Sequence, residues 1–314
     1  MSSSDASRGG IRLIAPGKIN LALEVLGRRS DGFHEIDTVM ATIDLADRIV
    51  LRPRPEGAGV EVSLTGEYAA GIDPEGDLSR LAAIRMAEAA GRSPDVTIEV
   101  EKRIPSPGGL GGGSSDAAAV IRGLNHLWGL EWSMTRLEAI GATIGSDVPF
   151  FLHGGTARCT GRGEVVEPLR DITPLRLLVL VPPVPAAANK TARRYADLHR
   201  HDFSDGGRSK RLAARVARKA PPPTTDFVNA FESVIERTEP ELVAHFARYA
   251  QAGAMRLHLC GAGPSVFLLI HENAKSAELR RDFRSVGATV FEVRTLGRAA
   301  ATAIEPVEQP EPLG

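Results

Sequence analysis

The chain has 314 residues, which at about 150 residues per domain suggests two domains. Its 38 Lys and Arg residues balance 39 Asp and Glu residues, and this balance argues against a dedicated nucleic-acid binder. Hydrophobic residues at 43% and charged residues at 25% are typical of a globular protein and argue against global disorder.

In chain order, strand-like and helix-like segments alternate. Strands are predicted at 11–14, 21–26, 48–52, 60–64, 96–100, 177–181, 256–259, 266–270 and 289–294, with a turn at 15–20. Helices are predicted at 78–91, 114–128, 135–143, 226–237, 240–252 and 274–286. Residues 204–224 suggest a surface excursion. The order indicates an α+β fold: a flexible N-terminus over 1–10, one unit over 11–170, a second over 171–300, and a tail over 301–314.

The two cysteines and the N-terminus help to predict the cellular compartment of the protein. Cys159 and Cys260 form no CxxC pair, so neither a zinc knuckle nor a disulfide framework is predicted. Residues 1–5 lack the features of a signal peptide, and no apolar stretch reaches the ~20 residues of a spanning helix. We therefore expect a soluble, cytoplasmic protein without membrane contacts.

A glycine-dense loop between a predicted strand and a predicted helix is the sharpest signal. It comprises Pro107, Gly108, Gly109, Leu110, Gly111, Gly112, Gly113, Ser114 and Ser115. Bare backbone N–H groups and a helix N-terminus together favour phosphate binding over a flexible linker or an ordinary Ser cap. The loop has neither the Lys of a Walker A motif nor the spacing of a Rossmann fingerprint. Valine at Gly111 or Gly112 is expected to weaken ATP binding without unfolding the chain, because the loop should be exposed.

Two polar residues elsewhere are weak signals when taken alone. Lys18 and Asn20 would project to one face of a strand, although a solitary Lys there is more often a solvated edge residue. Asp147, with Pro149 two residues on, could equally cap a helix.

Three motifs in order resemble the signature segments of the GHMP small-molecule kinases. They are Pro16-Gly-Lys-Ile-Asn20, Pro107-Gly-Gly-Leu-Gly-Gly-Gly-Ser-Ser115 and Gly261-Ala-Gly-Pro-Ser265. The strings Arg29-Ser-Asp-Gly-Phe-His-Glu-Ile36 and Gly145-Ser-Asp-Val-Pro-Phe-Phe151 narrow the likeness to members whose alcohol substrate carries a cytidine diphosphate group. The resemblance implies an N-terminal ribosomal-S5-domain-2-like unit and a C-terminal ferredoxin-like unit, with the active site between them.

The resemblance also implies roles. Lys18 and Asp147 would be catalytic, the loop 107–115 would hold ATP, and Mg²⁺ would accompany ATP with ligands unknown, Ser115 being only a guess. Substrate contacts would come from Asn20, Phe33, His34, Tyr195, Gly261, Ala262, Gly263 and Ser265. Phe33 would stack on cytosine, His34 would read its edge, and Tyr195 would close the sandwich. No nucleic acid is expected as a partner, and the protein is expected as a monomer or weak homodimer.

Alternatives stay open at this point. The substrate could be homoserine or a mevalonate-type acid, or the chain could be a silent nucleotide or RNA binder that uses its basic stretch, 208–219. A solvated amphipathic helix explains that stretch more simply. Phe33 could be a core anchor instead. Phe33 also stands where many relatives have Tyr, and Cys260 where Thr is more usual, so a hydroxyl contact there is in doubt.

Overall fold

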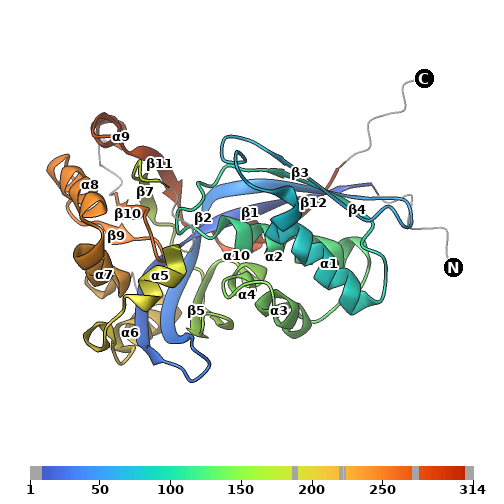
Figure 1. Ribbon diagram of the computed structural model, residues 1–314, viewed down its shortest axis with the longest axis horizontal. Coiled ribbons are helices and arrows are strands. Elements are labelled where there is room, and N and C mark those ends of the chain that lie inside the picture. Colours follow the sequence, from blue (N-terminus) through green and yellow to red (C-terminus); the bar gives the residue numbers. More distant parts are fainter. Residues whose placement is uncertain (1–8, 186–189, 219–221, 223, 271–275, 308–314) are drawn as a thin grey trace.

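Two antiparallel-rich sheets organise the part of the chain that the computed structural model describes, which is residues 9–185, 190–218, 222, 224–270 and 276–307 (Figure 1). In these ranges the first sheet holds β1 (Ile11–Arg28), β2 (His34–Pro53), β3 (Val60–Thr65), β4 (Val96–Glu101), β5 (Thr156–Gly161), β6 (Val165–Pro168), β8 (Val228–Asn229) and β12 (Ile304–Pro306). The second holds β7 (Arg176–Val181), β9 (His258–Leu259), β10 (Val266–Leu269) and β11 (Thr289–Arg294).

The first four helices lie on the first sheet, whereas the later six are shared between the two sheets. Those on the side of the first sheet are α1 (Leu78–Ala90), α2 (Gly112–Leu127), α3 (Met134–Ala142) and α4 (Val148–His153). The later ones are α5 (Lys190–Ala196), α6 (Gly207–Ala217), α7 (Phe231–Thr238), α8 (Pro240–Gln251), α9 (Ser276–Ser285) and α10 (Arg298–Ala301). The longest described helix, α2, has 16 residues, and within the described ranges no helix has the length and apolar composition to cross a bilayer.

The described residues form three hydrophobic cores, and β1 contributes side chains to each of them, because irregularities in its pairing with β2 turn successive stretches toward different faces. Leu13 and Ala15 pack in the core beneath α1–α4, whereas Ile19 and Leu21 pack in the core shared with the second sheet. The pairing of β1 with β2 shifts register between Pro16, opposite Ala46, and Lys18, opposite Thr42, so that β2 carries two extra residues at this irregularity. The predicted turn at 15–20 is wrong, because Pro16 and Gly17 lie within one continuous strand, opposite a bulge in β2.

Residues 301–306 correct a second prediction, that of a tail. Ala301 ends α10, and β12 pairs antiparallel with the start of β1, where Leu13 lies opposite Ile304. Backbone pairing with the edge of β1 orders this short segment. The predicted flexible residues 1–8 and the tail from 308 lie outside the described residues.

The predicted helix 226–237 is also interrupted. Asn229 lies in β8, and its side-chain amide donates to the carbonyl oxygens of Leu259 (3.1 Å) and Gly261 (2.8 Å). The side-chain carbonyl oxygen of Asn229 accepts a hydrogen bond from the backbone N–H of Phe231, where α7 begins. Asn229 thus starts the helix later than predicted and ties it to the last glycine loop.

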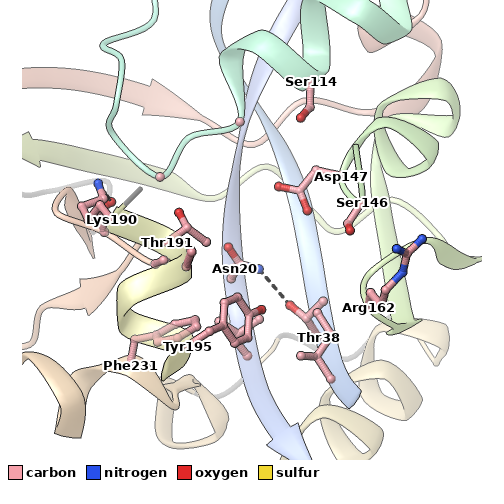
Figure 2. A pocket seen from close by; sticks show the side chains of 18 of the residues that line it. Asn20, Thr38, Ser114, Ser146, Asp147, Arg162, Lys190, Thr191, Tyr195 and Phe231 are labelled. Carbon is pink, nitrogen blue, oxygen red and sulfur yellow. Dashed lines mark hydrogen bonds between the residues drawn. The ribbon is translucent and has the colours of Figure 1, made fainter. Parts of the chain in front are cut away.

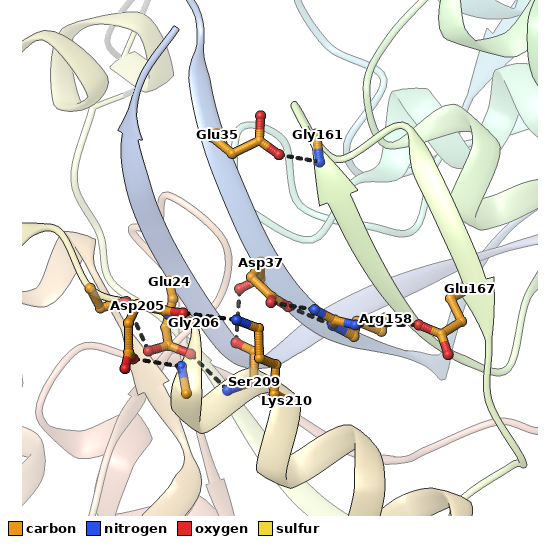
Figure 3. Close-up of polar contacts among 12 residues, drawn as sticks. Glu24, Glu35, Asp37, Arg158, Gly161, Glu167, Asp205, Gly206, Ser209 and Lys210 are labelled. Carbon is orange, nitrogen blue, oxygen red and sulfur yellow. Dashed lines mark hydrogen bonds and ion pairs between the residues drawn. The ribbon is translucent and has the colours of Figure 1, made fainter.

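The basic stretch forms α6, an amphipathic helix as the simpler interpretation predicted. Its residues Leu212 and Val216 are buried against β1 and β2. The buried Glu24 carboxylate accepts from the Ser209 backbone N–H at 2.7 Å, and the Ser209 hydroxyl donates to the Asp37 carbonyl at 2.8 Å (Figure 3). The helix is therefore an integrated element rather than a loose surface excursion. Lys219, the last residue of the stretch, lies outside the described residues.

Candidate active site

A single cavity of about 1130 Å³ brings the three signature motifs together. Figure 2 shows Asn20 and Thr38 on neighbouring strands, with Ser114, Ser146 and Asp147 to one side of them and Lys190, Thr191 and Tyr195 of α5 to the other. The first two motifs reach it from β1 and from the start of α2, and the third from the loop between β9 and β10.

Lys18, Asn20 and Asp147 meet in the lining of this cavity. The Lys18 ammonium donates to the Asn20 carbonyl oxygen at 2.7 Å and lies 3.8 Å from an Asp147 carboxylate oxygen. Asn20 is fixed in turn by donating to the Thr38 hydroxyl at 2.9 Å. The side chain of Lys18 is only 5% exposed, whereas that of Asp147 is 36% exposed and open to the cavity. The predicted shared face of Lys18 and Asn20 is confirmed.

Asp147 occupies the N-cap position of α4 without acting as a cap. Its side chain makes no capping hydrogen bond, and Phe151 N–H bonds instead to its backbone carbonyl. Capping usually works through the side-chain oxygen, so α4 does not need this carboxylate. The carboxylate is left to face Lys18.

The phosphate loop differs in detail from its prediction. α2 begins after Gly111, so Gly111 rather than a Ser occupies the N-cap position. Ser114 lines the cavity, whereas Leu110 and Ser115 are buried behind the surface that lines it. Gly111 has φ 77°, and a Cβ there would lie 2.8 Å from the Phe151 ring. The expectation that the loop is exposed enough to accept Val at Gly111 is therefore wrong.

The third glycine loop packs directly on the first two motifs. A Cβ on Gly261 would lie 2.7 Å from the Lys18 ammonium, and a Cβ on Gly109 would lie 2.1 Å from the Cys260 carbonyl oxygen. Glycine is required at both positions because no side chain fits in the contact. Ala262 and Gly263 also line the cavity, whereas Ser265 is buried and binds the loop through its backbone N–H to Gly108 O at 3.3 Å.

A buried charge cluster, which the sequence analysis missed, anchors both ends of the phosphate loop. Lys102 donates to Asp47 and, at 2.5 Å, to Asp116 near the start of α2. Asp47 also accepts the backbone N–H of Ile104 at 2.7 Å. Burial opposes the charge of Lys102, but Asp116 and Asp47 outweigh it and raise its pKa. Burial also disfavours the charged form of Asp116, and this raises the pKa of Asp116 well above its usual range.

Three aromatic rings, those of Phe33, His34 and Tyr195, also line the cavity. Phe33 is 51% exposed, with the Arg162 guanidinium 4.8 Å from its ring centre, which excludes the core-anchor alternative. His34 stacks on Tyr195, the ring centres being 5.1 Å apart. Burial, and then the charge of Arg28, lower the pKa of His34. The three predicted residues therefore line one region, but Tyr195 stacks on His34 and Phe33 contacts Arg162.

Relatives of this chain share one activity name. A curated protein of Dehalococcoides mccartyi named 4-diphosphocytidyl-2-C-methyl-D-erythritol kinase is 39% identical over 289 residues, covering 91% of this chain and 99% of that protein. A protein of the same name from Geobacillus thermodenitrificans is 37% identical over 283 residues, covering 90% of this chain and 96% of that protein. The chain belongs to the 4-diphosphocytidyl-2-C-methyl-D-erythritol kinase family.

Broader comparisons place this kinase family within a larger group. Residues 78–155 match the GHMP kinases N terminal domain. A crystal structure of 4-(cytidine 5′-diphospho)-2C-methyl-D-erythritol kinase covers 91% of this chain and 100% of its own, with a TM-score of 0.73 and 33% identity. Homoserine kinase from Cytophaga hutchinsonii, at 16% identity and TM-score 0.64, shares the fold. The match covers 98% of this chain and 99% of that kinase. The predicted GHMP kinase fold is confirmed.

Several cavity residues were not predicted from the motifs of this kinase family. Lys190, Thr191, Arg162 and Phe231 line the cavity, but they lie in segments without a recognisable pattern. Ser146 also lines it and lies within the string Gly145–Phe151, where it was not singled out. Lys190 follows a Pro- and Ala-rich stretch, and Arg162 lies in a Gly-Arg-Gly turn. The position of a charged residue between two glycines is the one sequence feature that could have indicated Arg162.

Proposed function

We propose that this protein transfers the γ-phosphoryl group of ATP to the 2-hydroxyl of 4-diphosphocytidyl-2-C-methyl-D-erythritol. The products are ADP and the 2-phosphate, in the non-mevalonate route to isoprenoid precursors. The observation that carries the proposal is one cavity lined both by the Lys18–Asp147 pair and by the rings of Phe33, His34 and Tyr195. An acceptor that carries a cytidine diphosphate group suits that arrangement, because a base can stack on the rings while its alcohol reaches the charged pair.

Asp147 accepts the proton of the attacking hydroxyl, and Lys18 stabilises the negative charge that develops on the oxygen. The 3.8 Å separation of their charged groups supports the assignment, since both can contact one oxygen placed between them. Phosphoryl-transfer transition states are usually loose, so alignment by Asn20 and the glycine loops contributes more than base strength.

ATP binds along the loop 107–115, with its phosphates at the backbone N–H groups that begin α2. Mg²⁺ would neutralise phosphate charge during transfer. Magnesium usually takes only one or two protein oxygens beside phosphate and water, and the Ser114 hydroxyl on the cavity wall fits that need better than the buried Ser115. Within the described residues, no group of three His, Cys, Asp or Glu side chains could hold an ion alone.

The remaining assignments concern the substrate and the whole protein. Phe33 stacks on cytosine, His34 hydrogen-bonds to its edge, and Tyr195 supplies the second ring. Gly261, Ala262 and Gly263 support the substrate, with Ser265 holding their loop. Residues 11–170 act as the ATP-binding unit and 171–300 as the second unit. The protein works in the cytoplasm as a monomer or weak homodimer, without nucleic acid.

A coupled ADP-release assay tests the proposal. 4-Diphosphocytidyl-2-C-methyl-D-erythritol, homoserine and mevalonate are each supplied with ATP and Mg²⁺, and ADP release is expected only with the first. Turnover of homoserine or mevalonate alone would replace the substrate assignment. No turnover with any alcohol, together with RNA affinity that falls steeply as salt rises, would favour the binding-protein alternative.

A further inference from the structure

Lys190, the first residue of α5, lies where two glycine loops meet. Its ammonium donates to the Gly263 carbonyl in the third loop and, at 3.4 Å, to the Pro107 carbonyl at the start of the phosphate loop. It also lines the cavity, and Figure 2 shows it across the view from Asp147 and Arg162. The ammonium therefore reaches both glycine loops from the side opposite the proposed base.

The partners of Lys190 leave its charge uncompensated. Both are neutral carbonyl groups, and across the described residues no carboxylate forms an ion pair with it. Arg194, one turn later, shows the contrast: Glu239 holds its guanidinium through two hydrogen bonds of 2.5 Å. Burial, and then the charge of Arg194, lower the pKa of Lys190 to about 8, although Glu239 opposes the shift.

A half-buried cation without a counter-ion is poorly stabilised, and an anion that enters the cavity would supply the missing charge. An ammonium has three N–H donors on a flexible stem, so it can exchange a carbonyl for a phosphate oxygen without movement of the helix. The ligands of the proposed reaction both carry phosphates. Pro107 begins the loop assigned to ATP, and Gly263 belongs to the loop assigned to the substrate.

From this geometry we infer that Lys190 is a phosphate-binding residue, which pairs with the triphosphate of ATP or with the diphosphate of the acceptor. The inference rests on the proposed function for the identity of these ligands. It differs from a purely structural role, in which Lys190 only ties the two loops together through their carbonyls.

The test measures dissociation constants by titration calorimetry, without turnover. The probes are a non-hydrolysable ATP analogue, CDP, and cytidine as the phosphate-free control. Lys190→Met is compared with wild type, with Lys190→Arg as the charge-retaining variant. Arg193→Met is the matched control, because Arg193 is an exposed cation on the same helix that does not line the cavity.

Lys190→Met is expected to weaken binding of the ATP analogue or of CDP about tenfold, and to leave cytidine binding and the thermal midpoint unchanged. Lys190→Arg and Arg193→Met should stay within about twofold of wild type. The probe that loses affinity identifies the phosphate source. Raising the pH from 7 to 9 should weaken the same probe's binding to wild type, because the ammonium loses its proton above pH 8, but not to Lys190→Arg.

Unchanged affinities for both phosphate probes would overturn the inference. So would an equal loss for cytidine with a lower thermal midpoint, which is what a structural tie between the loops predicts. If wild type binds neither the ATP analogue nor CDP, the proposed function itself fails before any variant is compared.

Discussion

At the residue scale, the chemistry depends on a carboxylate that the fold leaves free. Asp147 begins α4, yet its side chain makes no capping bond and lies 3.8 Å from the Lys18 ammonium. The same residue type at the same position would serve a helix well as a cap, so the sequence alone could not separate the two roles. The hydrogen bonds of the fold do separate them.

Asp147→Asn is expected to lower kcat about 10²–10⁴-fold while nucleotide affinity stays close to wild type. Asn keeps the size and polarity of the side chain but cannot take up the proton of the hydroxyl. Steady-state kinetics together with calorimetric ATP binding check this, and the thermal midpoint serves as the control. Turnover near the wild-type rate would show that the carboxylate is not the base.

Phe33 allows a second test at this scale. Phe33→Leu should raise KM for the cytidine-bearing substrate about tenfold, whereas Phe33→Tyr should resemble wild type, because stacking needs the flat ring and not its para substituent. Since Phe33 is half exposed, Leu should hardly change the thermal midpoint. An unmoved KM for Phe33→Leu would contradict cytosine stacking.

At the element scale, periodicity predicted most helices and strands, because long amphipathic segments have one face to bury. α1 (Leu78–Ala90), which ends at left-handed Gly91, lies where its pattern predicted it. The failures have specific causes. Pro16-Gly17 in β1 has the local sequence of a turn, but pairing of Pro16 with β2 and the hydrogen bond from Lys18 N–H to the Leu110 carbonyl keep the chain extended. Lys102 and Asp116 meet only through tertiary contact, so no spacing rule could pair them.

The glycines of the phosphate loop are expected to differ in what they tolerate. Gly111→Ala should cost about 2 kcal/mol of unfolding free energy, because it forces a left-handed φ and a contact with Phe151. Gly113→Ala should keep or slightly raise stability, since its φ is ordinary and Ala favours helices. Its methyl group, beside Leu78 on the cavity wall, should nevertheless weaken ATP binding. Denaturant unfolding and calorimetry check both, and equal stability losses would refute the distinction.

β9 carries a test of pH dependence. His258 is buried between the rings of Phe227 and Phe267, and burial, then Arg256, lower its pKa to about 4. The unfolded chain takes up this proton near pH 6.5, before the folded chain does. The contribution of His258 to the free energy of unfolding is therefore fully present above pH 6.5, and about 3 kcal/mol of it is lost as the pH drops to 4. Urea unfolding across this range should show the loss in wild type, and His258→Leu should lack that part of it.

At the scale of the whole molecule, the first sheet is assembled from both ends of the described chain. β12 (Ile304–Pro306) pairs with β1 beside Gly10, whose carbonyl accepts from Val307 N–H at 2.8 Å. β8 (Val228–Asn229) pairs with β1 ten residues further on. The return of these two segments to the first sheet was not predicted from the sequence.

Deleting residues 304–314 should lower the thermal midpoint by a few °C, because β1 loses its edge partner; a deletion of 308–314 is the matched control and keeps β12. Differential scanning calorimetry checks this. A loss of similar size in both deletions would show that β12 contributes nothing of its own.

The late arrival of β12 also affects how the protein is made. At ~5–20 residues per second, a ribosome needs ~15–60 s after making Leu13 before Ile304, its partner, exists. Throughout that interval, the strand bearing Lys18 has an unpaired edge of the kind that invites aggregation. Nascent chains stalled before Ile304 should therefore be cleaved by protease faster than full-length chains released from the ribosome. The edge of β1 beside Leu13 is therefore covered late in synthesis, after every other described strand of the first sheet has been made.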